Sequence, residues 1–387
     1  MKVNSDIVNK TVYVLIIVIS LLTFWQFKPS ELEECTITLK WYKSYNGETW
    51  AKVRTGMLWS FSYMGAMLPK DSFDKALTFS DSCQFTLNMH ELGFNAAALK
   101  ALSVICDSIK KTTEYQKNGS IDLSRFFVIS LYSPYNYYKI TNAEKDYDSY
   151  RANYPLSGSQ VFGVTKSAVS KGNRLIRFGA DSALLSLGMV AEEGYGSLIK
   201  KTFTPVKFET IAIMSNGQFR YAVYDKAGKL SDAANPEISS AGKPAKCMWC
   251  HEIVIQPLFS PNLAVAGMMT NDEFKLKVEE IQLRLNNYRK TLSTEIDFTK
   301  RQDHTQSELL YIGFMEPSDY RLKQEFGTDS VGLKQALKLR THTYKEFPFL
   351  GNLYIRKKID KLFAYPRIPV PDFVREKSNM EPDYFRH

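Results

Sequence analysis

Five consecutive residues, Cys-Met-Trp-Cys-His at positions 247–251, constrain this chain more than any other part of its sequence. Cys247 and Cys250 stand three positions apart, so on a helix both thiols lie on one face within a single turn. His251 follows directly and adds an imidazole to the same turn. With five cysteines and five histidines in the chain, chance would produce this pattern in roughly one such sequence in a thousand. The segment predicts a helical turn that presents two thiols and an imidazole to one ligand.

C-x-x-C-H is the pattern by which proteins attach c-type haem. The two thiols add to the vinyl groups of the porphyrin, and the histidine becomes the proximal iron ligand. A zinc site would need a second Cys/His pair at ligand spacing, and a thioredoxin-like motif would need a βαβ pattern; the sequence shows neither. A disulfide between Cys247 and Cys250 stays an alternative. The sequence favours one covalent haem c, held by Cys247, Cys250 and His251.

On these five residues the chain resembles the c-type cytochromes, which implies that haem is attached outside the cytoplasm. Residues 145–255 carry a second resemblance, since they contain a β-hairpin ending in Tyr-Asp-x-x-Gly, a polar loop and then the motif. This layout is similar to the hydroxylamine-oxidising cytochromes with a lysine-crosslinked haem and to the β-sheet cytochromes c-prime. It implies a five-coordinate iron that performs nitrogen chemistry or binds gases. The chain departs from both families by the long segment after its motif, and no lysine matches the crosslinking position.

The residue facing the distal side of the iron would set its potential and reactivity. Met315, in Phe-Met-Glu-Pro and 64 residues after His251, is the first candidate, because the Met loop of small cytochromes c has a similar separation and a nearby proline. Further candidates are Met268 and Met269, His304, and the upstream His90. An iron without a distal protein ligand is the remaining alternative.

The N-terminus predicts export. Residues 12–27 form an uncharged, largely apolar run of 16 residues that follows Lys2 and Lys10. A positive segment before an apolar stretch is the layout of an export signal, and the length approaches the ~17–25 residues of a membrane span. With no small-residue cleavage site after it, the run favours an uncleaved anchor. The positive-inside rule then places the body on the periplasmic side of the bacterial inner membrane; a cleaved signal with a free periplasmic protein is the alternative.

Charge and the other cysteines add two expectations. The formal net charge of +9 favours anionic partners, such as an acidic redox protein of the cell envelope. The basic residues form no dense run and no nucleic-acid module is recognisable, so no nucleic-acid partner is expected. In an oxidising compartment Cys83 and Cys106 would form a disulfide or remain buried thiols, with Cys35 left as the odd cysteine near the membrane.

The pattern along the chain predicts an α+β fold. Asn95 is expected to cap a helix, Asn216-Gly217 between two β-rich runs predicts a hairpin, and Thr270 with Glu273 predicts a capping box. The expected organisation is a cytoplasmic tip with a transmembrane signal anchor (1–35), a mainly helical domain (36–155), a β-rich region (156–245), a helical haem c region (246–345) and an extended C-terminal tail (346–387).

Three functions fit these features. A membrane-anchored mono-haem cytochrome would transfer single electrons to or from an envelope redox partner, and it needs a distal ligand. An open-site haem protein would catalyse small-molecule redox chemistry or bind a gas, and it needs a vacant distal face with a nearby acid, base or hydrogen-bond donor. An envelope binding protein, in which haem is secondary, would explain the long segment before the motif.

Overall fold

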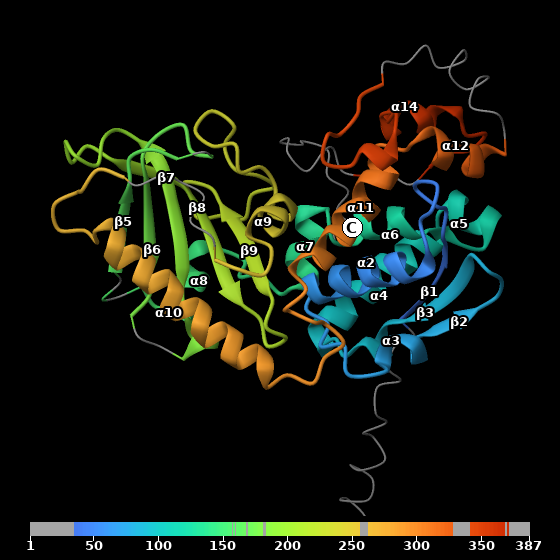
Figure 1. Cartoon of the computed structure of the whole chain (residues 1–387), viewed down its shortest axis with the longest axis horizontal. Coiled ribbons are helices and arrows are strands. Elements are labelled where there is room, and N and C mark those ends of the chain that lie inside the picture. The colour runs from blue at the N-terminus through green and yellow to red at the C-terminus, as the bar shows by residue number, and fades with distance from the viewer. Residues whose placement is uncertain are drawn as a thin grey trace, which may run out of the picture.

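The computed structural model describes residues 35–367, apart from 157, 159, 168, 181–182, 256–261 and 328–340, together with residue 370. The chain forms two units that lie side by side (Figure 1). The first unit begins with β1 (Thr36–Lys40), α2 (Trp50–Tyr63), α3 (Ser72–Lys75), β2 (Leu77–Phe79), β3 (Gln84–Asn88), η1 (Met89–Leu92), α4 (Ala96–Lys110), α5 (Thr113–Asn118), β4 (Ile121–Asp122), α6 (Leu123–Ser130) and α7 (Pro134–Ile140).

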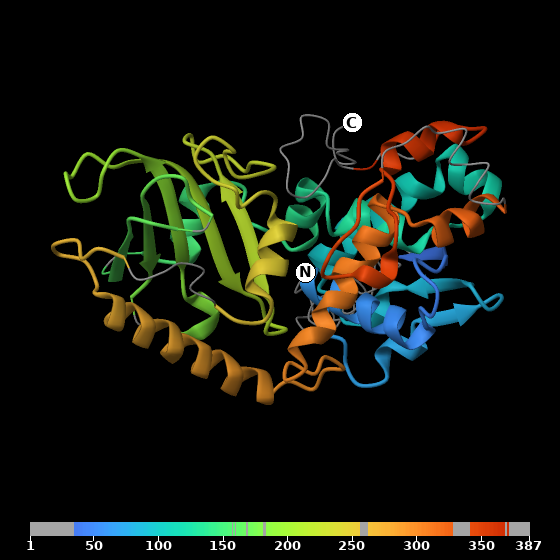
Figure 2. The same cartoon turned by 45° about the horizontal axis from the view of Figure 1, so that its top comes forward.

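The second unit is inserted into the sequence of the first. It contains α8 (Tyr147–Asn153), β5 (Gln160–Val164), β6 (Arg174–Phe178), η2 (Leu184–Ser186), β7 (Met189–Tyr195), β8 (Thr204–Ile213), β9 (Phe219–Tyr224), α9 (Pro244–His251) and α10 (Asn271–Lys290). The chain then returns to the first unit (Figure 2). This return consists of η3 (Arg301–His304), α11 (Thr305–Met315), α12 (Asp319–Phe326), η4 (Pro348–Leu350), α14 (Arg356–Ile359) and η5 (Asp360–Leu362).

The first unit contains a four-stranded sheet in the order β2-β3-β1-β4, although its sequence suggested a mainly helical region. β1 and β3 pair antiparallel along their whole length, and both alternate between buried and half-buried residues. Ile37, Leu39, Phe85 and Leu87 form the buried side. The alternation is short and the two strands lie far apart in sequence, so neither run stands out without its partner. The predicted Asn95 cap of α4 is confirmed, because its side chain accepts a hydrogen bond from the Ala98 amide at 2.9 Å.

The core of the first unit is built around α2 and α11. The second half of α2 is buried on all sides, as expected for an apolar helix that does not lie at a surface. α11 packs against both α2 and α6, and it is buried along nearly all of its length. The two helices approach closely at Gly56, where an added Cβ would lie 2.7 Å from the Gln306 carbonyl oxygen.

We expect Gly56→Ala to destabilise the protein by about 1–3 kcal/mol, because the added methyl group meets backbone that cannot move aside without separating the helices. The neighbouring substitution Thr55→Ala is the control, since it removes a hydroxyl that bonds only the Ala51 carbonyl of the same helix. The measurement is the urea midpoint of each variant. Equal midpoints for Gly56→Ala and Thr55→Ala would contradict the close approach of α2 and α11.

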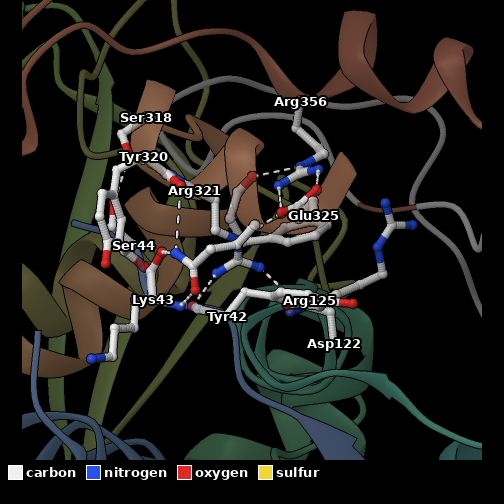
Figure 3. Close-up of polar contacts among 12 residues, drawn as sticks. Tyr42, Lys43, Ser44, Asp122, Arg125, Ser318, Tyr320, Arg321, Glu325 and Arg356 are labelled. Atoms are coloured by element: carbon white, nitrogen blue, oxygen red, sulfur yellow. Dashed lines mark hydrogen bonds and ion pairs between the residues drawn. The ribbon is translucent and has the colours of Figure 1, made fainter. Parts of the chain in front are cut away.

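A buried ion network fastens the returning segment to the first unit (Figure 3). Glu325 accepts hydrogen bonds from Arg321 at 2.6 Å and from Arg356 at 2.7 Å. Arg321 also contacts Asp122, the residue that caps α6, and donates to the Tyr42 carbonyl oxygen at 2.9 Å. Both guanidinium groups are fully buried. Their charges are therefore balanced inside the protein rather than by water.

The second unit is a five-stranded antiparallel meander in which neighbouring strands follow one another along the chain, from β5 to β9. The predicted hairpin is confirmed: β8 and β9 pair from Phe208↔Tyr224 to Ile213↔Phe219, and Gly217 in the turn has a φ of +78°. Such a backbone conformation favours glycine. α8 covers one face of the sheet, where Tyr147 stacks on Phe208 with ring centroids 4.2 Å apart.

α9 and α10 lie on the opposite face of this sheet. The predicted capping box is confirmed at the start of α10, with Thr270 and Glu273 bonding each other's backbone amides. The buried face of the helix includes Phe274, which stacks on Phe162 of β5 at 4.2 Å. α9 lies at the edge of the sheet that faces the first unit (Figure 2). The hairpin turn contacts the first unit too, since Asn216 donates hydrogen bonds to the Ser62 and Ala66 carbonyl oxygens at 2.8 and 2.9 Å.

The expected architecture needs two corrections, although the α+β class is retained. Within the described ranges, no helix combines the length and the apolar character that crossing a membrane requires, so the anchor helix expected as part of the fold is not found there; residues 12–27, on which that expectation rested, lie outside those ranges. The helical region expected over 246–345 is not one body either. α9 and α10 pack with the second unit, whereas α11 and α12 belong to the first, because α11 buries its surface against α2 and α6.

Candidate functional site

The helix α9 presents the Cys-x-x-Cys-His motif. Pro244 stands in its first turn, where a missing amide hydrogen costs nothing, and the helix ends at Glu252, which has a φ of +48°. The two residues between the cysteines fix the helix in place. Met248 is buried, and Trp249 packs against Tyr132 and Tyr311 of the first unit, with ring centroids 5.9 and 5.2 Å away. The motif is thus held between the two units.

A cavity lies directly beside the motif. Cys247, Cys250 and His251 form one wall, and Phe274 and Val278 of α10 form another. The third wall is the sheet, which contributes two rows of paired residues: Phe178, Met189, Ile211 and Tyr221, then Ile176, Ala191, Glu209 and Val223. The centres of water-sized spheres can occupy about 110 Å³ of it. Its lining is mostly apolar, as in most ligand pockets of proteins.

His251 is suited to bind a metal ion through a neutral ring. Burial, reinforced by the positive charge of Arg174, lowers the pKa of His251 from 6.5 to about 4, so the imidazole is uncharged at neutral pH and has a free lone pair. Its Nδ1 atom is buried without a hydrogen-bond partner among the described residues. A buried polar atom of this kind usually has a hydrogen-bond partner. The imidazole is therefore available to a bound group.

The two thiols of the motif are not bonded to each other. No disulfide joins any of the five cysteines in this structure, so the Cys247–Cys250 disulfide that the sequence left open is not observed here. Burial, followed by the charge of Glu209, raises the pKa of Cys247, and its Sγ lies 3.9 Å from the Lys243 carbonyl oxygen. Both thiols line the cavity.

One charged cluster interrupts the apolar wall of the cavity. Arg174 of β6 forms ion pairs with Glu193 of β7 and, at 3.3 Å, with Glu209 of β8. Burial, followed by the charge of Glu193, raises the pKa of Glu209 from 4.5 to about 8. Within the described chain, Glu193 Oε2 and Glu209 Oε1 have no donor. Two carboxylates that lie together in a buried site cannot both ionise easily, and the raised pKa keeps Glu209 mostly protonated at neutral pH.

This proton has a measurable effect on stability. Because the pKa of Glu209 is higher in the folded protein, the protein loses stability as the pH rises from about 4.5 to about 8, by at most ~1.4 kcal/mol per pH unit. We expect Glu209→Gln, which keeps a neutral group, to remove this slope. Urea unfolding at a series of pH values measures it. Parallel stability curves for the two proteins across that range would contradict the raised pKa of Glu209.

The predicted distal ligands do not meet the motif. None of Met315, Met268, Met269, His304 and His90 is among the residues that line the cavity. Met315 is buried in α11, His304 lies against the Trp59 ring at 6.5 Å, and His90 lies in η1. Met268 and Met269 lie beside β5, where the Met269 amide donates to the Val161 carbonyl oxygen.

Sequence reasoning missed several residues that do line the cavity. Met189 stands on β7, a strand that no motif marked, and Arg174 and Glu209 belong to strands whose pairing was unknown. The alternation of Arg174, Ile176 and Phe178 along β6 would have shown that these side chains share a face. It would not have shown that the face meets α9.

The residues present fit a covalently attached iron porphyrin. Two thiols and a neutral imidazole border one apolar cavity, and the imidazole has an unsatisfied buried nitrogen. Within the described chain no three His, Cys, Asp or Glu side chains come together to hold a metal ion. Iron in a porphyrin does not need such a group, because the porphyrin supplies most of its ligands and the protein adds an axial one.

Comparison with known proteins gives no relative: no family model, curated protein or solved structure matches the chain. The chain is an α+β protein in which an inserted antiparallel sheet and a Cys-x-x-Cys-His helix enclose a cavity.

Proposed function

We propose that the protein is a c-type cytochrome that binds one haem c covalently in the cavity between α9 and the five-stranded sheet. One observation carries the proposal: among the described cysteines and histidines, the three of the motif border an apolar cavity. Cys247 and Cys250 would hold the porphyrin through thioether bonds, and His251 would be the proximal ligand. The haem would supply reversible one-electron chemistry at its iron.

The chain's own residues would bind and orient the group. The apolar rows of the sheet and Phe274 would pack against the porphyrin, and Trp249 holds α9 against Tyr132 and Tyr311 of the first unit. Arg174 and Glu209 place a positive charge and an exchangeable proton at the cavity wall. A proton donor and a hydrogen-bond donor beside a cavity suit a small molecule that gains or loses protons as it reacts.

We therefore favour an open-site haem protein that acts on or binds a small molecule. None of the distal iron ligands predicted from the sequence lines the cavity, whereas Arg174 and Glu209 do. Single-electron transfer with an acidic envelope partner is the second candidate, because Met189, buried on β7, also lines the cavity. A methionine ligand there would close the distal position.

Carbon monoxide separates the two candidates. We expect the reduced wild-type protein to bind carbon monoxide readily, with a shift of the Soret band, and Met189→Leu to bind it with the same affinity. If Met189 is an iron ligand, the wild type will bind weakly and Met189→Leu at least tenfold more tightly. That second result would replace the open-site function by electron transfer.

The proposal includes a location. Haem is attached to C-x-x-C-H proteins outside the cytoplasm of bacteria, as the resemblance to c-type cytochromes implies, so the body of the protein is proposed to lie in the periplasm. Fractionation of the bacterial cell tests this: haem-bearing protein is expected in the envelope fractions. Haem-bearing protein confined to the cytoplasm would contradict it.

A further inference from the structure

Two cysteines outside the motif lie together in the core of the first unit. Cys35 stands immediately before β1, and Cys106 lies in the last turns of α4. Their side chains are buried, with 1% and 0% of their surfaces exposed. The proximity of Cys35 is the first of the causes that raise the pKa of Cys106, and Cys35 Sγ lies 3.9 Å from the Leu99 carbonyl oxygen of α4. The contact therefore joins the start of the sheet to the helix that covers it.

Local structure explains why these two residues meet. β1 is an inner strand of its sheet, with β3 on one side and β4 on the other. α4 packs on β1 through a buried face that includes Leu102, Ile105, Cys106 and Ile109. Cys35 continues the β1 strand into this contact, because its carbonyl oxygen still accepts a hydrogen bond from the Met89 amide.

The pairing expected from the sequence, Cys83 with Cys106, is not formed. Cys83 lies at the other end of the same strand pair, since its carbonyl oxygen accepts from the Trp41 amide. Trp41 follows Cys35 by six positions, across the whole of β1, which is about 20 Å at ~3.4 Å per residue. A disulfide needs Cα atoms within about 7 Å. Cys83, which is partly exposed, is therefore too distant from the Cys35–Cys106 contact.

We propose that Cys35 and Cys106 form a disulfide in the mature protein. This inference rests on the proposed periplasmic location, since disulfides form and persist in oxidising compartments. The oxidant would be the disulfide of an envelope thiol oxidase. A thiolate of one cysteine attacks it to give a mixed disulfide, and the second thiolate then displaces the oxidase. The Cys35–Cys106 bond forms, and two electrons and two protons pass to the oxidase, which leaves as a dithiol.

This thiol–disulfide exchange would take place while the chain folds, before the two cysteines are buried. Contact with Cys35, together with burial, raises the pKa of Cys106, and a thiol reacts only as its thiolate. Both side chains are closed to a second protein once α4 covers β1. The bond would join residues 71 positions apart and tie the chain, as it enters from residues 1–34, to the core of the first unit.

The first experiment counts thiols in haem-bearing protein purified from the envelope. After denaturation without reductant and alkylation with iodoacetamide, we expect Cys83 to be alkylated and Cys35 and Cys106 to remain in one linked peptide pair. Reduction should separate the pair and release two alkylation sites. Alkylated Cys35 and Cys106 on a protein that carries haem would overturn the disulfide alone. The same thiols on a protein without haem would overturn the proposed function as well.

A second experiment uses stability. We expect Cys35→Ser, Cys106→Ser and the double variant to share one lowered urea midpoint, because each removes the same bond, whereas Cys83→Ser keeps the wild-type midpoint. A reductant should lower the wild-type midpoint toward that of the double variant and leave the double variant unchanged. A wild-type midpoint that does not respond to reductant in unfolding titrations at equilibrium would contradict the bond.

Discussion

Replacing Cys247 and Cys250 together by serine will abolish covalent haem. Serine keeps the size of the side chain but has no thiol, so neither thioether bond to the porphyrin can form. Both side chains line the cavity. Haem that still entered the cavity would be held by non-covalent contacts and would be lost on denaturation. The measurement is haem-dependent peroxidase staining of denatured protein on a gel, together with the pyridine haemochrome spectrum.

Cys83→Ser is the matched control, since Cys83 is also a partly exposed free cysteine of the chain. It lies beside β3 in the first unit, away from the cavity, and this variant should keep one haem per chain. The two single variants Cys247→Ser and Cys250→Ser should each retain at most one thioether bond. Haem in the denatured double variant at the wild-type amount would contradict the assignment of the motif.

The second large effect is on folding: Glu325→Gln will destabilise the protein by about 3–5 kcal/mol. Glu325 is the shared counter-charge of Arg321 and Arg356, and these guanidinium groups have no exposed surface. Glutamine keeps the shape but not the charge, so two buried cations would lose the carboxylate they share. Because the network joins α12 and α14 to β4 and α6, we expect the returning segment to detach first. Urea unfolding, followed by limited proteolysis, measures both effects.

The pH dependence of this variant gives a further test. Although burial opposes ionisation, the two arginines hold the pKa of Glu325 below its ordinary value of 4.5. Its contribution to stability is therefore complete above that pH and is lost as the pH falls below it. The difference between wild type and Glu325→Gln should shrink in acid. Asp148→Asn is the control, because the Arg151–Asp148 pair is exposed and such pairs contribute little. A loss for Glu325→Gln as small as that of the control would contradict the network's role.

Local sequence signals predicted the elements that depend on neighbours in the chain. Asn216-Gly217 gave the hairpin because the turn itself selects glycine, and Thr270 with Glu273 gave the start of α10 because both hydrogen bonds lie within four residues. The motif at Cys247, Cys250 and His251 was visible for the same reason. Its chemistry depends on spacing along one helical turn.

The remainder depends on contacts between distant residues. β1 and β3 are short strands whose sequences can be recognised as strands only when their pairing is known. No local segment of the sequence shows that the second unit is inserted into the first. The cavity needs the register of β6, β7 and β8, which brings Arg174 and Glu193 opposite each other and sets Glu209 beside them. Met315 was a reasonable ligand by separation from His251, but α11 returns to the first unit and takes this side chain with it.

The most direct test of the central claim is the mass of the tryptic peptide of residues 247–275, which begins after Lys246 and contains the whole motif. The protein should be made in a bacterium that exports it and attaches haem, then denatured before digestion. We predict that this peptide carries the added mass of one haem, with fragment ions that place it on Cys247 and Cys250. The unmodified peptide, from protein purified out of the envelope of a strain that matures other c-type cytochromes, would contradict the account.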